Sequence, residues 1–191
     1  MEQSAKRIYL SPPRVTSEDE IAVVEAMRSG WLAPLGPELA AFESDVAEYL
    51  GVEAAVGLSS GTAGIHLGLR YLGVEPGDVV ILPTTTFAAS AFPVTYLGAE
   101  PVFVDIDESW NLDPQVLTQA ISELAKQGRR ITATIPVDLY GTPANYGEIA
   151  PILEAEGIPL LEDAAEGLGG SFLRERLGSA GGGGILSFNG N

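Results

Sequence analysis

The stretch SSGTAG, Ser59–Gly64, combines residue types that bind a phosphate group at the start of a helix. Ser60 can cap the helix, and Gly61 lets the backbone approach a ligand closely. The free amides of Thr62 and Ala63 would then point out of the helix N-terminus, where amides and the helix dipole bind a phosphate dianion. The Thr62 hydroxyl adds another donor. A helix that is simply capped, with no ligand, is the alternative for this stretch alone.

A dinucleotide-binding turn fits the same stretch less well. Its glycines do not form the pattern G-x-G-x-x-G, and no acidic residue ends the following strand, where Leu82 leads into Pro83 and Thr84. A single phosphorylated group is therefore the preferred ligand.

A carboxylate suited to a heterocyclic ring follows another apolar run, in LLEDAAEGLGG. In extended geometry Asp163 and Ala165 project to one face of the strand. The carboxylate can pair with a ring N–H, while the alanine methyl leaves room for the ring. Because further acids such as Glu166 lie nearby, a solvated acidic loop is the alternative.

Two more side chains could contact the same ligand. Phe87, at the end of PTTTF, could stack its aromatic face on a planar ring, although a core phenylalanine on an amphipathic helix is the alternative. Ser187 ends an apolar run after the glycines 181–184 and could donate its hydroxyl to the same phosphate. Gly190 predicts a tight turn that carries the chain back over the pocket.

Alternating helical and strand patterns supply the elements that must position these residues. Helices are expected at 17–29, 38–50, 62–72, 87–96, 114–127 and 145–157, and strands at Ala54–Leu58, Val79–Leu82, Pro101–Val104, Ile131–Val137, Ile158–Leu161 and Ile185–Phe188. Ser17 or Thr16 is expected to cap the first helix, with Glu20 in a capping box and Gly30 at its end. Strands that are apolar on both faces and separated by helices indicate an α/β fold, with a mostly parallel sheet covered by helices on both faces. Ligands of such sheets bind beyond the carboxyl ends of the strands.

Composition excludes several kinds of partner. Ten basic against 26 acidic residues give a formal charge of −16, which argues against nucleic acid and anionic membranes because binding phosphates in number needs clustered Lys and Arg. With no Cys and a single His, the sequence offers no disulfide and no thiolate, and no metal site is expected. No membrane-spanning stretch or signal-peptide pattern is found, so a cytoplasmic protein is expected.

Six motifs, in this order and spacing, resemble the DegT/DnrJ/EryC1/StrS family of sugar aminotransferases: IYLSPP, SGWLAPLGP, SSGTAGIHLGLR, PVDLYGTP, LEDAAEGLGG and ILSFNGN. The resemblance implies a fold-type I pyridoxal 5′-phosphate (PLP) transferase. Residues 1–36 would form an N-terminal arm and helix that line the substrate pocket, and 37–191 the PLP-binding large domain, without its remaining strand and the small C-terminal domain. The family's Schiff-base lysine would come immediately after Asn191. We therefore expect the N-terminal half of a longer enzyme, inactive and unstable when isolated.

The resemblance also assigns roles to individual residues. Four of them would hold the cofactor phosphate: Gly61, Thr62, Ala63 and Ser187. Phe87 would stack on the pyridine ring, with Ala165 near its other face, and Asp163 would pair with the ring nitrogen and keep it protonated. Glu166 would lie near the 3-hydroxyl of the cofactor or near the substrate. The sugar pocket would be lined by Trp31, Leu35 and Gly36.

The activity implied by the resemblance is transfer of an amino group from glutamate to a nucleotide-linked 4-keto-6-deoxy sugar, for surface polysaccharide or glycan precursors. The full-length enzyme would be a homodimer. Two alternatives stay open: a PLP- or pyridoxamine-phosphate-dependent sugar 3-dehydratase of the same fold, with His in place of the lysine, and a noncatalytic homologue that keeps the fold.

Overall fold

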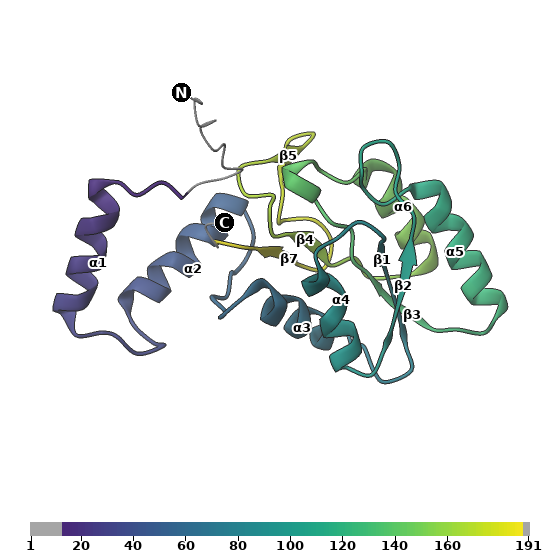
Figure 1. Ribbon diagram of the computed structural model, residues 1–191, viewed down its shortest axis with the longest axis horizontal. Coiled ribbons are helices and arrows are strands. Elements are labelled where there is room, and N and C mark those ends of the chain that lie inside the picture. Colours follow the sequence, from purple (N-terminus) through teal and green to yellow (C-terminus); the bar gives the residue numbers. More distant parts are fainter. Residues whose placement is uncertain (1–12, 189–191) are drawn as a thin grey trace, which may run out of the picture.

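Parallel strands form the centre of the molecule in a computed structural model that describes residues 13–188 (Figure 1). Three of them lie in the order β2 (Glu100–Val104), β1 (Val79–Pro83) and β3 (Ile131–Thr134). A second parallel pair joins β4 (Glu162–Ala164) to β7 (Gly184–Leu186). Two parallel bridges, Thr134 to Leu160 and Val137 to Asp163, connect the two groups. The strands therefore follow one another in the order β2, β1, β3, β4 and β7.

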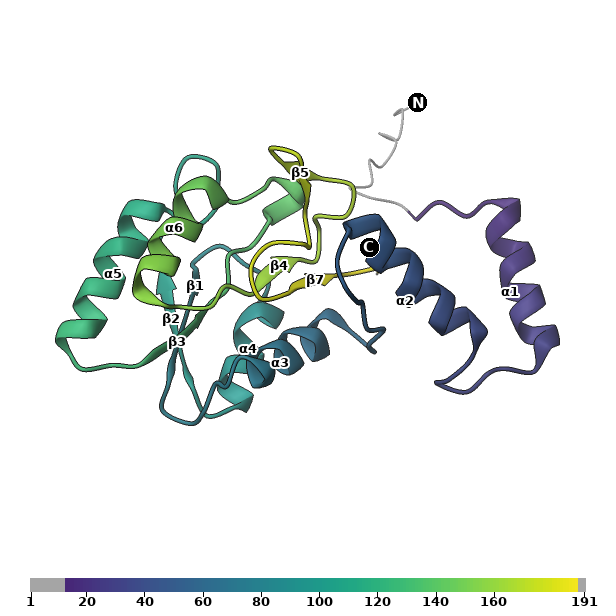
Figure 2. The same cartoon turned by 180° about the vertical axis from the view of Figure 1, so that it is seen from behind.

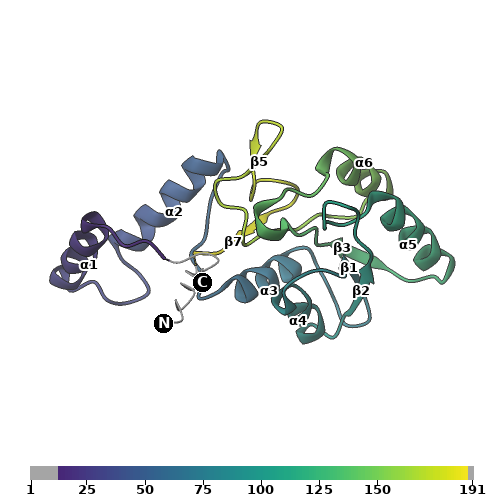
Figure 3. The same cartoon turned by 45° about the horizontal axis from the view of Figure 1, so that its top comes forward.

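Helices cover both faces of these strands, as the sequence predicts. Side chains of β1 alternate between two apolar clusters. Val79 and Ile81 pack in a cluster with residues of α5 (Pro114–Lys126) and α6 (Tyr146–Glu156). Val80 and Leu82 pack on the other side, with residues of α3 (Gly61–Tyr71) and α4 (Ala88–Tyr96). Figure 3 shows the two helix pairs on opposite sides of the strands.

Two N-terminal helices lie at one end of this core (Figure 2). No residue of α1 (Ser17–Ser29) is buried. Its cap is Thr16, and Asp19 completes the capping box in place of the predicted Glu20, because the third helical position after Thr16 is Asp19. The next helix, α2 (Pro37–Leu50), contacts the core through Phe42, whose ring centroid lies 4.9 Å from that of Phe188.

Local predictions differ from the structure at three places. The strand expected at Ile158–Leu161 lies later in the chain, as β4, and Leu160 and Leu161 form only isolated bridges. The run Ala54–Leu58 forms no strand, since no strand lies beside it among residues 13–188, and the Val56 and Leu58 side chains are exposed. A short antiparallel hairpin, β5 (Ser171–Phe172) and β6 (Glu175–Arg176), was not predicted because strands of two residues show no periodicity. Within the described part of the chain, no helix combines the length and apolar character needed to cross a membrane.

Candidate active site

Asp163 is a nearly buried carboxylate on β4, with 5% of its surface exposed. It pairs in register with Ile185 of β7, and its side chain faces the same side of the sheet as Leu161, in the cluster covered by α3 and α4. Ser90 of α4 donates its hydroxyl to Asp163 Oδ2 at 2.6 Å. The other oxygen, Oδ1, accepts only a long bond of 3.3 Å from the Ala165 amide.

Burial raises the pKa of Asp163 above its ordinary value, and the charge of nearby Glu166 raises it further. The bonds from Ser90 and Ala165 lower this pKa and oppose the effect of burial. A buried carboxylate in this balance is stabilised by a cationic partner. The position therefore suits a protonated ring nitrogen, and Oδ1 has the capacity to accept from it.

The N-terminus of α3 lies close to β7. The Ser60 hydroxyl caps the helix by accepting from the Ala63 amide at 3.1 Å, which confirms the predicted cap. The prediction that the Ala63 amide is free is therefore wrong, because its proton is used by Ser60. The amides of Gly61 and Thr62 have no hydrogen-bond acceptor among residues 13–188. These two amides are the donors that the start of the helix offers to an anion.

A close approach between α3 and β7 brings these amides to the side of the sheet that Asp163 faces. A Cβ added at Gly64 would lie 3.3 Å from Cδ1 and Cγ2 of Ile185, and one added at Gly61 would lie 3.7 Å from Ile185 Cγ2. Ile185 in turn pairs with Asp163. The start of α3 and Asp163 therefore lie on the same face, separated by one strand.

Phe87 and Ser187 also follow elements of this face. Phe87 is the N-cap residue of α4, three residues before Ser90, and 80% of its surface is exposed. The alternative of a core phenylalanine is thereby excluded. Ser187 directly follows β7, two residues after Ile185, and alternation along the strand assigns both to the same face.

Glu166 and Ala165 follow β4 directly. The Glu166 carboxylate accepts a 2.7 Å hydrogen bond from the backbone amide of Tyr140. Tyr140 has a positive φ of 52°, so this bond supports a strained turn after β3. Ala165 is half-buried. The contact of Glu166 that the structure shows is thus with the backbone.

The predicted substrate residues lie apart from this cluster. Trp31 and Leu35 are 59% and 78% exposed, in the loop between α1 and α2. A Cβ added at Gly36 would lie 3.4 Å from Trp31 Cβ, so this residue and Trp31 contact each other. No contact from the three to Asp163 or to the start of α3 is found within residues 13–188. Gly190, Asn191 and the expected lysine position after it lie outside the described residues.

A second group of acids, which sequence reasoning missed, lies on the opposite face of the sheet. Both oxygens of Glu162 accept backbone hydrogen bonds of 2.7 Å, from the amides of Gly178 and Ala180. Asp138 Oδ1 accepts from the Ala144 amide and from the Tyr146 hydroxyl, each at 2.9 Å. Asp138 Oδ2 has no partner among the described residues.

The two acids of this group affect one another. Burial, with a smaller contribution from the neighbouring Glu162, raises the pKa of Asp138 to about 8, although the bonds from Ala144 and Tyr146 lower it. A neutral Asp138 can donate its proton toward Glu162, which relieves the repulsion between two buried carboxylates. The pair therefore belongs to the hydrogen-bond network on the α5 and α6 side, away from the unpaired amides of α3.

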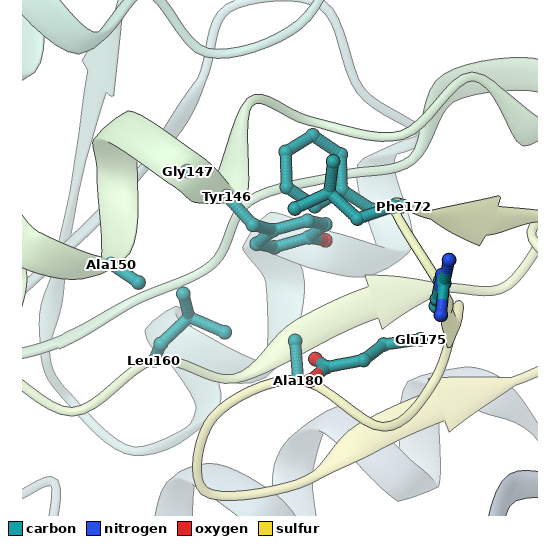
Figure 4. Close-up of a pocket in the computed structure, with 9 residues that line it drawn as sticks. Tyr146, Gly147, Ala150, Leu160, Phe172, Glu175 and Ala180 are labelled. Carbon is teal, nitrogen blue, oxygen red and sulfur yellow. The ribbon is translucent and has the colours of Figure 1, made fainter.

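A cavity of about 550 Å³ also lies on that side, between α6 and the β5–β6 hairpin (Figure 4). Its walls are mainly apolar, and the rings of Tyr146 and Phe172 meet there with their centroids 5.8 Å apart. None of the predicted site residues lines this cavity. The candidate active site is therefore the cluster around Asp163 and the start of α3.

Comparison with known proteins shows which family the chain resembles along its length. The chain is 46% identical over 187 residues to EpsN of Bacillus subtilis (strain 168), named as a PLP-dependent aminotransferase, and covers 48% of that protein. It is 37% identical over 186 residues to a GDP-perosamine synthase of Caulobacter vibrioides, again covering 48% of it. These alignments each include 97% of the present chain, which thus spans about half the length of the relatives it matches.

Structural similarity is equally extensive. A PLP-form structure of Spr1654 from Streptococcus pneumoniae, named as a sugar aminotransferase, superposes with a TM-score of 0.87 at 32% identity, covering 96% of this chain and 49% of that one. The fold is therefore that of the fold-type I PLP aminotransferases. The family model for the DegT/DnrJ/EryC1/StrS aminotransferases matches residues 13–191. The chain belongs to the DegT/DnrJ/EryC1/StrS aminotransferase family.

Proposed function

We propose that this chain supplies the cofactor-binding half of a PLP-dependent aminotransferase that moves an amino group from glutamate to a nucleotide-linked 4-keto-6-deoxy sugar, for surface polysaccharide or glycan precursors. Relatives named as a GDP-perosamine synthase and as UDP-sugar aminotransferases support a nucleotide sugar as the acceptor. Membership of the family supports the reaction type.

The residues present fit the cofactor. The unpaired amides of Gly61 and Thr62, at a helix N-terminus, would bind its phosphate, with Ala63 in the same turn and Ser187 at the end of β7. The exposed ring of Phe87 would stack on the pyridine, and Ala165 would border the other side of the ring. Asp163 Oδ1 would accept a hydrogen bond from the protonated ring nitrogen. The cofactor, when bound, supplies an electron sink for the carbon that loses its proton.

The single observation that carries this proposal is the placement of Asp163. It is a buried carboxylate on β4. The neighbouring strand β7 separates it from the start of α3, where two amides are unpaired. Its negative charge would hold a proton on the ring nitrogen, and the two amides would hold the dianion at a fixed distance from it. Together, Asp163 and the two amides would fix the orientation of the ring.

Residues outside this cluster complete the proposal. We assign Trp31, Leu35 and Gly36, with the arm 1–36, to the sugar pocket, and 37–191 to the large domain. The exposure of Trp31 and Leu35 and the lack of any buried residue in α1 support a further surface that covers them, which a second subunit of a cytoplasmic homodimer would provide. We assign Glu166, which follows Ala165, to the edge of the site, near the 3-hydroxyl of the cofactor or near the substrate.

The test uses the complete gene product that contains residues 1–191. Titration with PLP, followed by absorbance, is expected to show stoichiometric binding, and glutamate is expected to convert the bound cofactor to its amine form. Asp163→Asn should lower the rate of that conversion by about a hundredfold or more, because the ring nitrogen loses its anionic partner. Asp45→Asn, an exposed acid of α2, is the matched control. Equal rates for the Asp163→Asn and Asp45→Asn variants would refute the role of Asp163.

A further inference from the structure

Two hydroxyl side chains of one helix end form a short chain of hydrogen bonds that leads to Asp163. Thr86 Oγ1 and Ser90 Oγ, four residues apart, lie 2.6 Å from each other. Ser90 is fully buried and its Oγ lies 2.6 Å from Asp163 Oδ2. The rest of α4 is almost entirely apolar, in the sequence AASAFPVTY, so packing alone does not require hydroxyl groups here.

The direction of these bonds follows from counting protons. A serine hydroxyl has one proton, and Ser90 donates it to Asp163 Oδ2. In the contact with Thr86 it must therefore accept, so Thr86 is the donor. Among residues 13–188, Thr86 has one other acceptor, the carbonyl oxygen of its neighbour Phe87, at a longer 3.4 Å. Both hydroxyl protons thus point along the chain toward the carboxylate.

In this series of hydrogen bonds, Ser90 donates to Asp163 Oδ2. The series therefore favours an Oδ2 that carries no proton. A proton on Oδ2 would face the proton of Ser90 and reverse both bonds. The chain also fixes the carboxylate in rotation, because Oδ2 is held from α4 while Oδ1 accepts only the 3.3 Å bond from Ala165. Oδ1 is thereby left as the oxygen with capacity for a ligand donor.

We infer that Ser90, oriented by Thr86, is a positioning residue that keeps Asp163 anionic and directs Oδ1 to the ligand. The inference rests on the proposed function for the identity of that ligand, a protonated ring nitrogen. The relay, by which we mean the hydrogen bonds from Thr86 to Ser90 and from Ser90 to Asp163, rests on the observed contacts alone.

The surroundings of Asp163 have opposing effects on its pKa. Burial raises the pKa of Asp163, and the charge of Glu166 raises it to a smaller extent. The hydrogen bond from Ser90 lowers this pKa, and the bond from the Ala165 amide lowers it less. Across the sheet, burial raises the pKa of Tyr146, and the charge of Asp163 makes a small contribution in the same direction. The Ser90 bond is thus the main contribution from the protein that favours the ionised form, before any ligand binds.

The first experiment measures the carboxyl group itself in the cofactor-free complete gene product. The titration of Asp163 is followed by NMR of ¹³C-carboxyl-labelled aspartate, with the signal assigned through Asp163→Asn. Ser90→Ala and Thr86→Val should each raise the pKa of Asp163, with the larger change for Ser90→Ala, and Thr86→Ser should restore the wild-type value. Thr95→Ala removes a hydroxyl from the last turn of the same helix, where it bonds only Phe92 O, and should leave the titration unchanged.

An unchanged Asp163 titration in a folded Ser90→Ala or Thr86→Val variant would overturn the inference, since a hydroxyl that only fills space would give that result. Ser90 lies in the first turn of α4 and is buried, whereas Thr86 precedes the helix and is only half-buried, so one folded variant is enough to decide.

The second experiment measures affinity for PLP at neutral pH. Ser90→Ala should weaken binding about tenfold relative to Thr95→Ala, the size of a lost hydrogen bond to a charged group. Equal affinities would contradict the effect of the relay on the ligand. Failure of the wild type to bind PLP would refute the proposed function, whereas the cofactor-free titration would still decide whether the relay exists.

Discussion

Neighbouring residues of β4 present two acids to opposite faces of the sheet. Asp163 faces α3 and α4, and Glu162 faces the side of α5 and α6. Glu162 has both oxygens bonded to backbone amides at 2.7 Å. Asp163 has one short bond, from a side-chain hydroxyl, and one long bond from an amide. The same dipeptide thus holds a carboxylate saturated by the protein and one that is not.

We interpret this difference as one between a structural acid, Glu162, and the proposed binding acid, Asp163. A carboxylate that accepts two short backbone bonds connects distant parts of the chain, since Gly178 and Ala180 lie 16 and 18 residues after Glu162. A carboxylate oxygen that accepts only one long hydrogen bond, such as Asp163 Oδ1, can accept another from a ligand. Substitutions on the two faces should therefore have different consequences: loss of stability on one, and loss of binding on the other.

Glu162→Gln should give the largest loss of stability. The amide side chain keeps one acceptor, and its NH₂ group then faces a backbone N–H that has lost its partner. We expect the free energy of unfolding of the complete gene product to fall by about 2–3 kcal/mol, because bonds to a buried charged group are replaced by one neutral bond and one unpaired donor. Chemical denaturation with cofactor present and absent measures this loss.

The matched control is Glu175→Gln in the exposed strand β6, which should change stability by less than about 0.5 kcal/mol. The rate of the fully folded, cofactor-saturated Glu162→Gln enzyme should equal that of wild type. A lowered rate with unchanged stability would place Glu162 in the binding machinery and break the distinction between the two faces.

Sequence patterns selected Asp163 as a candidate but gave no sign of the contacts of Glu162. Asp163 was identified because an acid directly follows apolar residues at the end of a strand, a pattern that depends only on neighbours in sequence. The partners of Glu162 lie in a glycine-rich loop many residues later, and no local pattern links them. Ser90 and Thr86 were missed as well. Two hydroxyls four residues apart, one just before an apolar helix and one in its first turn, were the available signal.

Fold predictions show the same limit. The helices are confirmed to within one residue at their starts, because helical periodicity and capping are local. Ala54–Leu58 looks like the other strands in composition, but a strand needs a neighbour to pair with, and nothing local to the run reveals whether one is present. The β5–β6 hairpin depends on contacts with α6 and α2 such as that between Arg176 and Tyr49.

The pair Asp138 and Glu162 should give stability a marked pH dependence. In the folded protein the pKa of Asp138 is about 8, whereas an unfolded aspartate titrates near its ordinary value. Between these values the folded state binds a proton that the unfolded state has lost. This contribution to stability is therefore complete below the ordinary pKa and is lost as the pH rises through about 8. The slope is about 1.4 kcal/mol per pH unit for one proton.

Asp138→Asn should remove that slope. The asparagine oxygen can still accept from Ala144 and Tyr146, and its NH₂ group takes the place of the carboxyl proton toward Glu162. Urea denaturation at pH 6 and pH 9 should show a smaller decline for the variant than for wild type, while Asp45→Asn should follow wild type. The raised pKa of Asp163 acts in the same direction and remains in both, so a residual slope is expected. Parallel curves for wild type and Asp138→Asn would show that Asp138 is ionised in the fold.

The smallest expected effect tests the binding face at the start of α3. Ser60→Ala removes the cap from the Ala63 amide and should lower stability by about 1 kcal/mol, the usual value for a lost N-cap. It also frees a third amide beside those of Gly61 and Thr62, at the position where a dianion would bind. Affinity for PLP should therefore fall by less than threefold, even though the helix start is weakened. The control is Thr16→Ala, which uncaps α1 on a helix with no buried residue and no contact with Asp163. If Ser60→Ala lost PLP affinity in proportion to its loss of stability, the helix start would contribute through its rigidity, and its free amides would not be the phosphate donors.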